Sequence, residues 1–243
     1  MEFIDIYNEN HKYLGVCEKG LAHKLGLWHE VFNGIIVNKE NKSIIFQIKN
    51  AQHNQVHTMD KIEISIGGHY QVGEKIEDGI REIKEESGIE MNFKDLIYLG
   101  ERQVSTVVKE DYIVREFQKI FIVPYNDSIT KLRCQDNEVK GFIEFKIDDC
   151  IDLFLKNKTS IKGIDNNEKN IKVTLKNFIE AYLKGDELYL RLAIASKRFI
   201  EGERIELLRW WIHDWLFYAK HSIIWTQEME EIKSKIEKFK IKV

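Results

Sequence analysis

The arrangement of short apolar runs around one short helix constrains the fold most strongly. Runs rich in Ile, Val, Phe and Tyr, bounded by Asn, Gly, Asp and Lys, are typical of β-strands. These runs are Val31–Val37, Ser43–Ile48, Ile62–Ile66, Ile97–Val108, Tyr112–Pro124 and Val139–Ile147. Between the third and fourth runs lies Glu77–Ser87, the clearest short helix of the first half. A helix inserted into a series of strands predicts an α/β or α+β fold, in which a sheet packs against helices.

Composition narrows the possible partners and compartments. The chain has 37 Lys and Arg against 40 Asp and Glu, a net charge of −3, which argues against binding to a nucleic acid polymer. Its 43% of hydrophobic residues supply a sizeable core and exclude disorder as the main state. No apolar run reaches the roughly 18–20 residues of a membrane span, and the first residues, MEFIDIYNEN, do not resemble a signal peptide. We therefore expect a cytoplasmic protein without a membrane partner.

The helix Glu77–Ser87 separates acidic from apolar residues. On a helical wheel with Glu82 at zero, Glu85 falls near about −60° and Glu86 near about +40°. The three isoleucines Ile76, Ile80 and Ile83 fall between about 100° and 160°. Such a helix can bury its isoleucines while its carboxylates converge on a hard cation such as Mg²⁺. The alternative for a charged run of this kind is a solvated helix face.

The residues around this helix form a specific pattern. Gly68 is followed after five residues by Glu74, and after six more by Arg81-Glu82-Ile83-Lys84-Glu85-Glu86-Ser87-Gly88-Ile89. This pattern resembles the Nudix box, in which a Gly, a Glu and the run Arg-Glu-apolar-x-Glu-Glu-x-Gly-apolar recur at fixed spacing. The spacer between Glu74 and Arg81 is one residue shorter than in the family. This difference raises doubt about a Glu74–Arg81 pair.

The resemblance implies a Nudix domain over residues 1–160, with a mixed sheet between helices. It also implies roles for the box residues. Glu82, Glu85 and Glu86 would bind Mg²⁺ or Mn²⁺ together with the backbone carbonyl of Gly68. Glu82 would double as the base, and Arg81 would orient the glutamates.

A second resemblance concerns the residues upstream of the box. The segment Ile4–Gly15 and the pairs Ala22-His23 and Trp28-His29 resemble the Nudix branch that contains type I isopentenyl-diphosphate isomerase. In that isomerase, two histidines of this region, a histidine after the box glycine and two glutamates of a later strand bind a metal. The residues at matching positions here, which we expect to contact the substrate or a further metal, are His23, His29, His69 and Glu116.

Two positions depart from the isomerase. Val114 stands where the first of the two glutamates is expected, and Gly67 stands where the isomerase carries its catalytic cysteine. Without that thiol, protonation of an alkene carbon lacks one of its acid/base groups. Each histidine also has a plainer interpretation as a side chain that hydrogen-bonds the backbone.

The last third of the chain predicts a helical extension, residues 167–243, after a linker at Ile161–Lys172. Apolar residues recur at helical spacing, whereas Leu188, Leu190, Leu192 and Ile194 alternate and leave a strand open there. The aromatic run Trp210–Tyr218 suggests a helical core, an oligomer interface or a wall over the substrate site. We expect a homodimer formed through this extension.

Together these features predict a Mg²⁺-dependent Nudix hydrolase. Its small-molecule substrate would be a nucleoside diphosphate joined to another group, or a related diphosphate. An isomerase of isoprenoid diphosphates and a non-catalytic, ligand-binding Nudix module remain as alternatives. The intact Glu82, Glu85 and Glu86 argue against the non-catalytic module.

Overall fold

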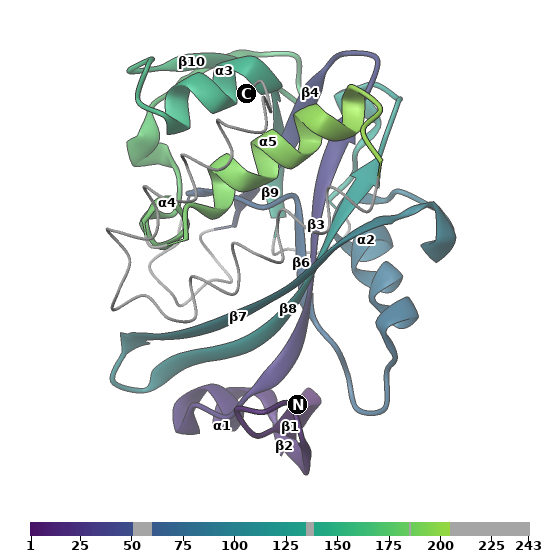
Figure 1. The fold of residues 1–243 in the computed structure, drawn as a ribbon, viewed down its shortest axis with the longest axis vertical. Coiled ribbons are helices and arrows are strands. Elements are labelled where there is room, and N and C mark those ends of the chain that lie inside the picture. The colour runs from purple at the N-terminus through teal and green to yellow at the C-terminus, as the bar shows by residue number, and fades with distance from the viewer. Residues whose placement is uncertain (51–59, 135–138, 185, 205–243) are drawn as a thin grey trace.

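A computed structural model describes residues 1–50, 60–134, 139–184 and 186–204 of the chain (Figure 1). Within them a sheet is flanked by helices, which confirms the mixed α/β class. The strands are β1 (Phe3–Tyr7), β2 (Tyr13–Glu18), β3 (His29–Asn38), β4 (Ser43–Lys49), β5 (Ile62–Glu63), β6 (Ile66–His69), β7 (Ile97–Lys109), β8 (Tyr112–Pro124), β9 (Val139–Lys146), β10 (Ile161–Asp165) and β11 (Asn170–Val173). The α-helices are α1 (Lys19–Leu25), α2 (Ile80–Ser87), α3 (Ile147–Phe154), α4 (Glu180–Leu183) and α5 (Leu188–Ile200).

The main sheet combines parallel and antiparallel pairs. Its order is β11-β10-β9-β4-β3-β8-β7, with β5 paired to β4 and β6 paired to β3. Strands β3 and β8 are parallel, with His29 opposite Glu116, whereas β6 runs antiparallel to β3, with His69 opposite Val31. The sheet therefore places β6, β3 and β8 side by side.

Each face of the sheet has its own core. On one face, residues such as Ile35, Phe46 and Ile120 pack with Tyr189 and Leu192 of α5. On the other face, Phe32, Ile36 and Phe121 pack with Ile83 of α2. Figure 1 shows α3 and α5 on one side of the sheet and α2 on the other. The alternation along β3 thus gives the sheet two buried faces, as expected for a strand covered on both sides.

The expected strand Ile62–Ile66 is divided into β5 and β6. Ser65 lies between them, and its hydroxyl accepts a hydrogen bond from the Ile36 amide at 2.8 Å and donates to the Ile45 carbonyl. The Ser65 side chain thereby replaces a backbone partner, and the chain changes from pairing with β4 to pairing with β3.

The expected box helix is present. A 3₁₀ turn at Ile76–Gly79 leads into α2, which ends at Gly88 with a φ of +74°. Glycine adopts this left-handed conformation without a steric penalty. The three isoleucines of the wheel lie in or against the core that contains Ile83, so the separation into apolar and acidic faces is confirmed.

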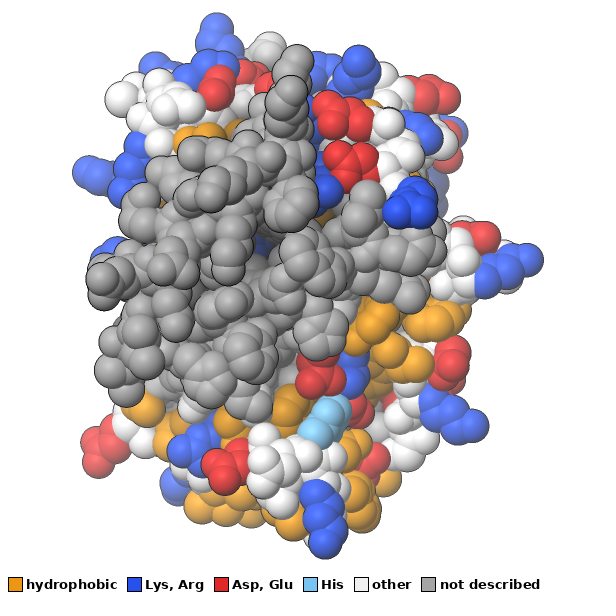
Figure 2. Space-filling view, viewed as in Figure 1, with side chains coloured by type: hydrophobic (Ala, Val, Ile, Leu, Met, Phe, Trp, Pro, Cys, Tyr) orange, Lys and Arg blue, Asp and Glu red, His pale blue; other side chains and the backbone are white. Residues whose placement is uncertain are grey.

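The N-terminal residues form a small unit against the end of β3 and β8. Strands β1 and β2 pair with each other, and the Tyr7 amide donates to the Trp28 carbonyl at 2.8 Å. Many apolar side chains of this unit are exposed, and Figure 2 shows hydrophobic side chains gathered at the corresponding lower end of the molecule. Helix α1 contributes Ala22 and His23 to the buried contacts with the sheet. The unit therefore delivers one histidine to the end of the sheet.

The segment after residue 160 differs from one expectation and answers one question that the sequence left open. The stretch expected to be a linker forms the antiparallel hairpin β10/β11, which extends the main sheet. The alternating leucines belong to helix α5, whose residues are buried around most of its circumference against the sheet and α3. The aromatic run on which the homodimer prediction rests lies outside the described residues. None of the helices in the described ranges is long and apolar enough to cross a membrane.

Candidate active site

The box glycine and the first box glutamate lie in close contact. A β-carbon built on Gly68 would come within 2.0 Å of the Glu82 Cδ atom and 2.2 Å of Glu82 Oε2. Any side chain at position 68 would therefore displace the Glu82 carboxylate. Glycine at this position allows strand β6 to approach α2 closely enough for its backbone to line the carboxylate site.

Arg81 connects the box acids. Its guanidinium donates to Glu85 Oε2 at 2.7 Å, lies 2.9 Å from Glu82 Oε1 and donates to Glu74 Oε1 at 3.1 Å. The pairing with Glu74, which the short spacer placed in doubt, is therefore present. Arg81 Nη2 also reaches the His69 carbonyl oxygen at 3.4 Å, which ties the helix to β6. A single guanidinium thus holds three carboxylates in place.

Glu86 is buried beside β6 and β4. Its Oε2 accepts a hydrogen bond from the Gly67 amide at 2.8 Å, and its Oε1 accepts one from Lys49 Nζ at 3.2 Å. Lys49 Nζ also lies 4.0 Å from Glu63 Oε2. The box motif does not include Lys49, so the sequence reasoning missed this charged neighbour of Glu86.

Two box carboxyls hold their protons unusually strongly. Burial raises the pKa of Glu82 to about 8, against the opposing charge of Arg81. Burial also raises the pKa of Glu86 to about 7, although Lys49 and the Gly67 amide favour the charged form. A bound divalent cation would remove this cost by neutralising both carboxylates.

The oxygen atoms of the box residues are of the kind that binds a hard cation. Mg²⁺ takes glutamate and backbone carbonyl oxygens as ligands. Glu82 and Glu86 are buried carboxyls with raised pKa values, and they lie beside Gly68 and Gly67 of β6. Their oxygens are engaged by Arg81 and Lys49 in this arrangement. Within the described ranges, the groups with three or more ligand atoms inside 4.8 Å are two other clusters. The metal role of the box glutamates therefore stays a prediction.

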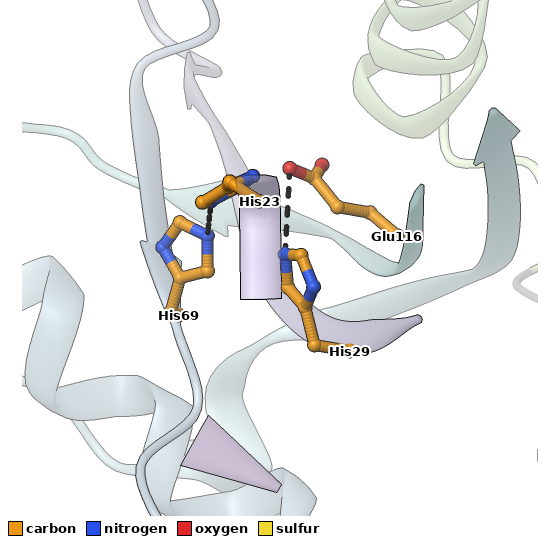
Figure 3. Close-up of side chains that lie close together, drawn as sticks. All are labelled: His23, His29, His69 and Glu116. Atoms are coloured by element: carbon orange, nitrogen blue, oxygen red, sulfur yellow. Dashed lines mark hydrogen bonds and ion pairs between the residues drawn. The ribbon is translucent and has the colours of Figure 1, made fainter. Parts of the chain in front are cut away.

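The first of these clusters unites the four residues expected to contact the substrate or a further metal. His23, His29, His69 and Glu116 each direct one ligand atom to a common point, all within 4.8 Å of one another (Figure 3). The sheet register explains the convergence, because His29 lies opposite Glu116 and His69 lies opposite Val31, two residues along β3. Residues two apart in a strand face the same side. Helix α1 adds His23, so four separate elements build the cluster.

The hydrogen bonds of the histidines fix the orientation of their lone pairs. His29 Nδ1 lies 2.8 Å from the Leu27 carbonyl, and His23 Nδ1 lies 3.3 Å from the Ile113 carbonyl. A carbonyl oxygen only accepts, so each Nδ1 carries the proton and each neutral ring has an unprotonated Nε2. His23 Nε2 lies 3.2 Å from His69 Nε2, from which it can accept a hydrogen bond. His29 Nε2 is buried without a hydrogen-bond donor in the described part of the chain, and it faces Glu116 Oε1 at 3.8 Å. Two acceptors facing each other require a cation or a proton between them.

The electrostatics agree with metal ligation. Burial lowers the pKa of His29 to about 4, and burial also lowers the pKa values of His23 and His69. The rings are therefore neutral near pH 7, as metal ligands must be. Three imidazoles and one carboxylate suit Zn²⁺, Mn²⁺ or Fe²⁺ better than Mg²⁺. The carbonyl bonds to Nδ1 are the kind of support that metal-binding histidines have in proteins.

The second cluster has a structural explanation. His11, Glu30 and Glu101 lie together, but Lys119 Nζ is 3.0 Å from Glu30 Oε1 and also pairs with Glu101. The ammonium group therefore already supplies the positive charge between the two carboxylates. His11 Nε2 donates to Glu30 Oε1 at 2.9 Å and its ring stacks on Phe117, so this cluster attaches the N-terminal hairpin to the sheet.

The box carboxylates and the histidine cluster lie on different sides of β6. Gly68 faces Glu82 and α2, whereas the next residue, His69, faces His23 and His29. Successive residues of a strand point to opposite faces. Gly67, which precedes them, would place a β-carbon 3.1 Å from Asn33 Oδ1, so a side chain there requires a small shift of Asn33.

The chain is similar to several known proteins. No protein-family model matches the chain. Among solved structures, a Deinococcus radiodurans protein is similar with 16% identity over 65% of this chain and 91% of its own, at a TM-score of 0.47. A NUDIX family hydrolase from Clostridium perfringens is similar with 18% identity over 68% of this chain and 97% of its own, at a TM-score of 0.40.

Sequence similarity to a curated protein is stronger. An uncharacterised Nudix hydrolase of Clostridium acetobutylicum is 34% identical over 164 residues, which are 65% of this chain and 75% of that protein. The box from Gly68 to Ile89 and the position of α2 beside β6 agree with this similarity. The chain belongs to the Nudix hydrolase family.

Proposed function

We propose that this Nudix hydrolase cleaves a pyrophosphate bond in a small diphosphate compound, with Mg²⁺ or Mn²⁺ held by Glu82, Glu85, Glu86 and the Gly68 carbonyl. One observation carries the proposal: Glu82 and Glu86 are buried, have raised pKa values and lie against the glycines of β6. Buried carboxyls of this kind are costly unless a cation neutralises them.

The protein residues have distinct tasks in this reaction. When bound, the metal offsets the charge of the diphosphate and lowers the pKa of a water molecule. Glu82 would accept the proton of that water, since it is the box carboxyl that lies against Gly68. Arg81 keeps Glu82 and Glu85 oriented through its 2.9 Å and 2.7 Å contacts. The Gly67 amide holds Glu86 at 2.8 Å, so the carboxylates are positioned before substrate arrives.

We further propose that His23, His29, His69 and Glu116 bind a second, softer metal ion next to the substrate. The bare Nε2 of His29 facing Glu116 supports this assignment. The metal content of protein purified without added metal, measured by mass spectrometry, tests it. We expect about one Zn²⁺, Mn²⁺ or Fe²⁺ per chain, and its loss in the His29→Asn variant.

The substrate test is a screen of purified protein with Mg²⁺. Nucleotides, sugar nucleotides, other nucleoside diphosphate compounds and isoprenoid diphosphates would be supplied, and phosphate-containing products would be measured. We expect that the protein cleaves the pyrophosphate bond of at least one of the nucleoside diphosphate compounds, and that this cleavage depends on Mg²⁺. The same screen should include the Glu86→Gln variant, because any activity that persists in this variant does not come from the proposed metal site.

An isomerase is the second candidate, and the histidine cluster is the observation in its favour. Gly67 argues against it, since no thiol stands at that position. Isopentenyl diphosphate in the same screen separates the two candidates. Conversion to dimethylallyl diphosphate by the native protein would replace the hydrolase proposal.

A further inference from the structure

Glu116 is one end of a buried chain of hydrogen bonds that leaves the histidine cluster. Its Oε2 accepts a hydrogen bond from Gln118 Nε2 at 2.7 Å, and Gln118 Oε1 accepts one from Arg102 Nη1 at 2.7 Å. Arg102 in turn makes a two-point ion pair with Asp186, at 2.9 Å from Nη2 to Oδ1 and by a second bond from Nε. All four residues are more than nine-tenths buried.

The strand pairing places these residues in one row. Glu116 and Gln118 are two apart in β8 and therefore face the same side of the sheet. Arg102 of β7 lies directly opposite Gln118 in the antiparallel ladder. Asp186 comes from the connection between α4 and α5, more than 80 residues from Arg102 along the chain, and it closes the row from outside the sheet. Tyr182 of α4 covers the guanidinium, with its ring centroid 5.4 Å from Arg102 Cζ.

The direction of each hydrogen bond is fixed by chemistry. A guanidinium only donates, so the Gln118 oxygen must face Arg102 and its NH₂ group must face Glu116. Glu116 Oε2 is therefore engaged, and the other oxygen, Oε1, faces His29 Nε2 at 3.8 Å. Asp186 prevents the guanidinium from turning toward Glu116 itself, because it occupies Nε and Nη2.

We infer that Gln118 and Arg102 are positioning residues, which present Glu116 Oε1 to the metal ion of the histidine cluster, and that Asp186 anchors them from the C-terminal part of the chain. This inference rests on the second metal site proposed above. A residue after position 160 thereby acts on the site: the Asp186 carboxylate orients the ligand Glu116 through Arg102 and Gln118. Supports of this kind typically change metal affinity by about 10- to 100-fold.

Cobalt provides the test, because Co²⁺ occupies sites of this kind and its visible absorption depends on its ligands. Full-length protein would be titrated with Co²⁺ in excess Mg²⁺, which fills oxygen-only sites and leaves the histidine nitrogens free. We expect Gln118→Met to weaken Co²⁺ binding by about 10- to 100-fold and to shift the absorption band. Asp186→Asn should weaken it as well. Arg102→Lys should also weaken Co²⁺ binding although it keeps the positive charge, because one ammonium group cannot bond Gln118 and both Asp186 oxygens.

Gln47→Met is the matched control. Gln47 is fully buried in β4 of the same sheet, and its amide has no hydrogen-bond partner in the described part of the chain. The substitution thus has the same chemistry and burial as Gln118→Met without a connection to Glu116. Its Co²⁺ affinity and spectrum should match those of the wild type. Gln118→Glu provides a second variant if Gln118→Met does not fold, since an ionised Glu cannot donate to Glu116.

The outcomes separate the inference from the site on which it rests. If Glu116→Gln leaves Co²⁺ binding unchanged, the proposed second metal site is wrong. If Glu116→Gln weakens binding but both Gln118 variants behave like Gln47→Met, the metal site stands and the positioning inference is wrong. If the Gln118 variants weaken binding and Asp186→Asn does not, the anchoring role of Asp186 is wrong.

Discussion

Gly68 and Glu82 are so close that a β-carbon on Gly68 would lie 2.0 Å from the Glu82 carboxyl carbon. The contact joins strand β6 to helix α2 at the proposed metal site. It explains in steric terms why a glycine precedes the helix by this spacing. The strand backbone can then share the site with the carboxylate.

Gly68→Ala tests this contact. The added methyl group should displace Glu82, which lies at the end of a flexible side chain, so the protein should fold while turnover falls by ~10²-fold or more. Gly20→Ala is the control, because Gly20 is exposed in α1 and its β-carbon would meet only the end of the Glu18 side chain, at 3.2 Å. Steady-state rates with Mg²⁺ and a thermal unfolding curve are the measurements. Equal rates for both alanine variants would contradict the steric argument.

The raised pKa of Glu86 predicts a pH effect on stability. Its folded pKa is about 7, against a usual value of 4.5, so the folded protein binds more protons than the unfolded chain between these values. The free energy of unfolding should therefore fall as the pH rises from about 4.5 through about 7. The buried histidines act in the opposite direction, but they are present in both proteins when wild type is compared with Glu86→Gln.

The comparison isolates Glu86. Between pH 5 and pH 8, without divalent metal, Glu86→Gln should gain stability relative to the wild type by on the order of 1–3 kcal/mol. Urea unfolding at a series of pH values measures the difference. A difference that stays constant across this range would show that Glu86 does not hold its proton as proposed.

The ion pair between Lys49 and Glu86 predicts an effect of Lys49 on metal binding. Lys49→Met removes the ammonium beside Glu86 Oε1, so the metal-free protein should lose roughly 1–3 kcal/mol of stability. Added Mg²⁺ should then raise the melting temperature more than in the wild type, because no ammonium group competes for the carboxylate. Lys140→Met is the control, since its ion pair with Asp60 is exposed and worth little. An unchanged Mg²⁺ effect in Lys49→Met would contradict this role.

The sequence was sufficient to predict the box helix and the strands β3, β4, β7, β8 and β9 of the sheet, because each carries a local signal. Alternating or continuous apolar runs mark the strands, and the isoleucines of α2 recur with helical spacing. Ser65 could not be recognised as the point where one strand divides, since its effect depends on the Ile36 amide and the Ile45 carbonyl of two other strands. The hairpin at 161–173 was mistaken for a linker because its polar residues form an exposed edge of the sheet.

Helix α5 shows a different limit. It is buried on most sides, so it has no single apolar stripe and its leucines fit a period of two as well as a helix. The resemblance identified the four residues of the histidine cluster, His23, His29, His69 and Glu116, before the structure showed them together. The inward orientation of its lone pairs depends on the Leu27 and Ile113 carbonyls. Lys49 and Asp186 belong to no motif, so only the fold brings them to the site.

The most direct measurement is the Mg²⁺-dependent hydrolysis rate of Glu82→Gln and Glu86→Gln on the compound found in the substrate screen. Glu77→Gln is the control, because Glu77 is exposed in the turn before α2. Circular dichroism would confirm that all three variants fold. We predict that both box variants lose ~10²-fold or more in turnover while Glu77→Gln keeps the wild-type rate. A folded Glu82→Gln or Glu86→Gln protein that hydrolyses the compound at the wild-type rate would contradict the assignment of these carboxylates to the catalytic metal site.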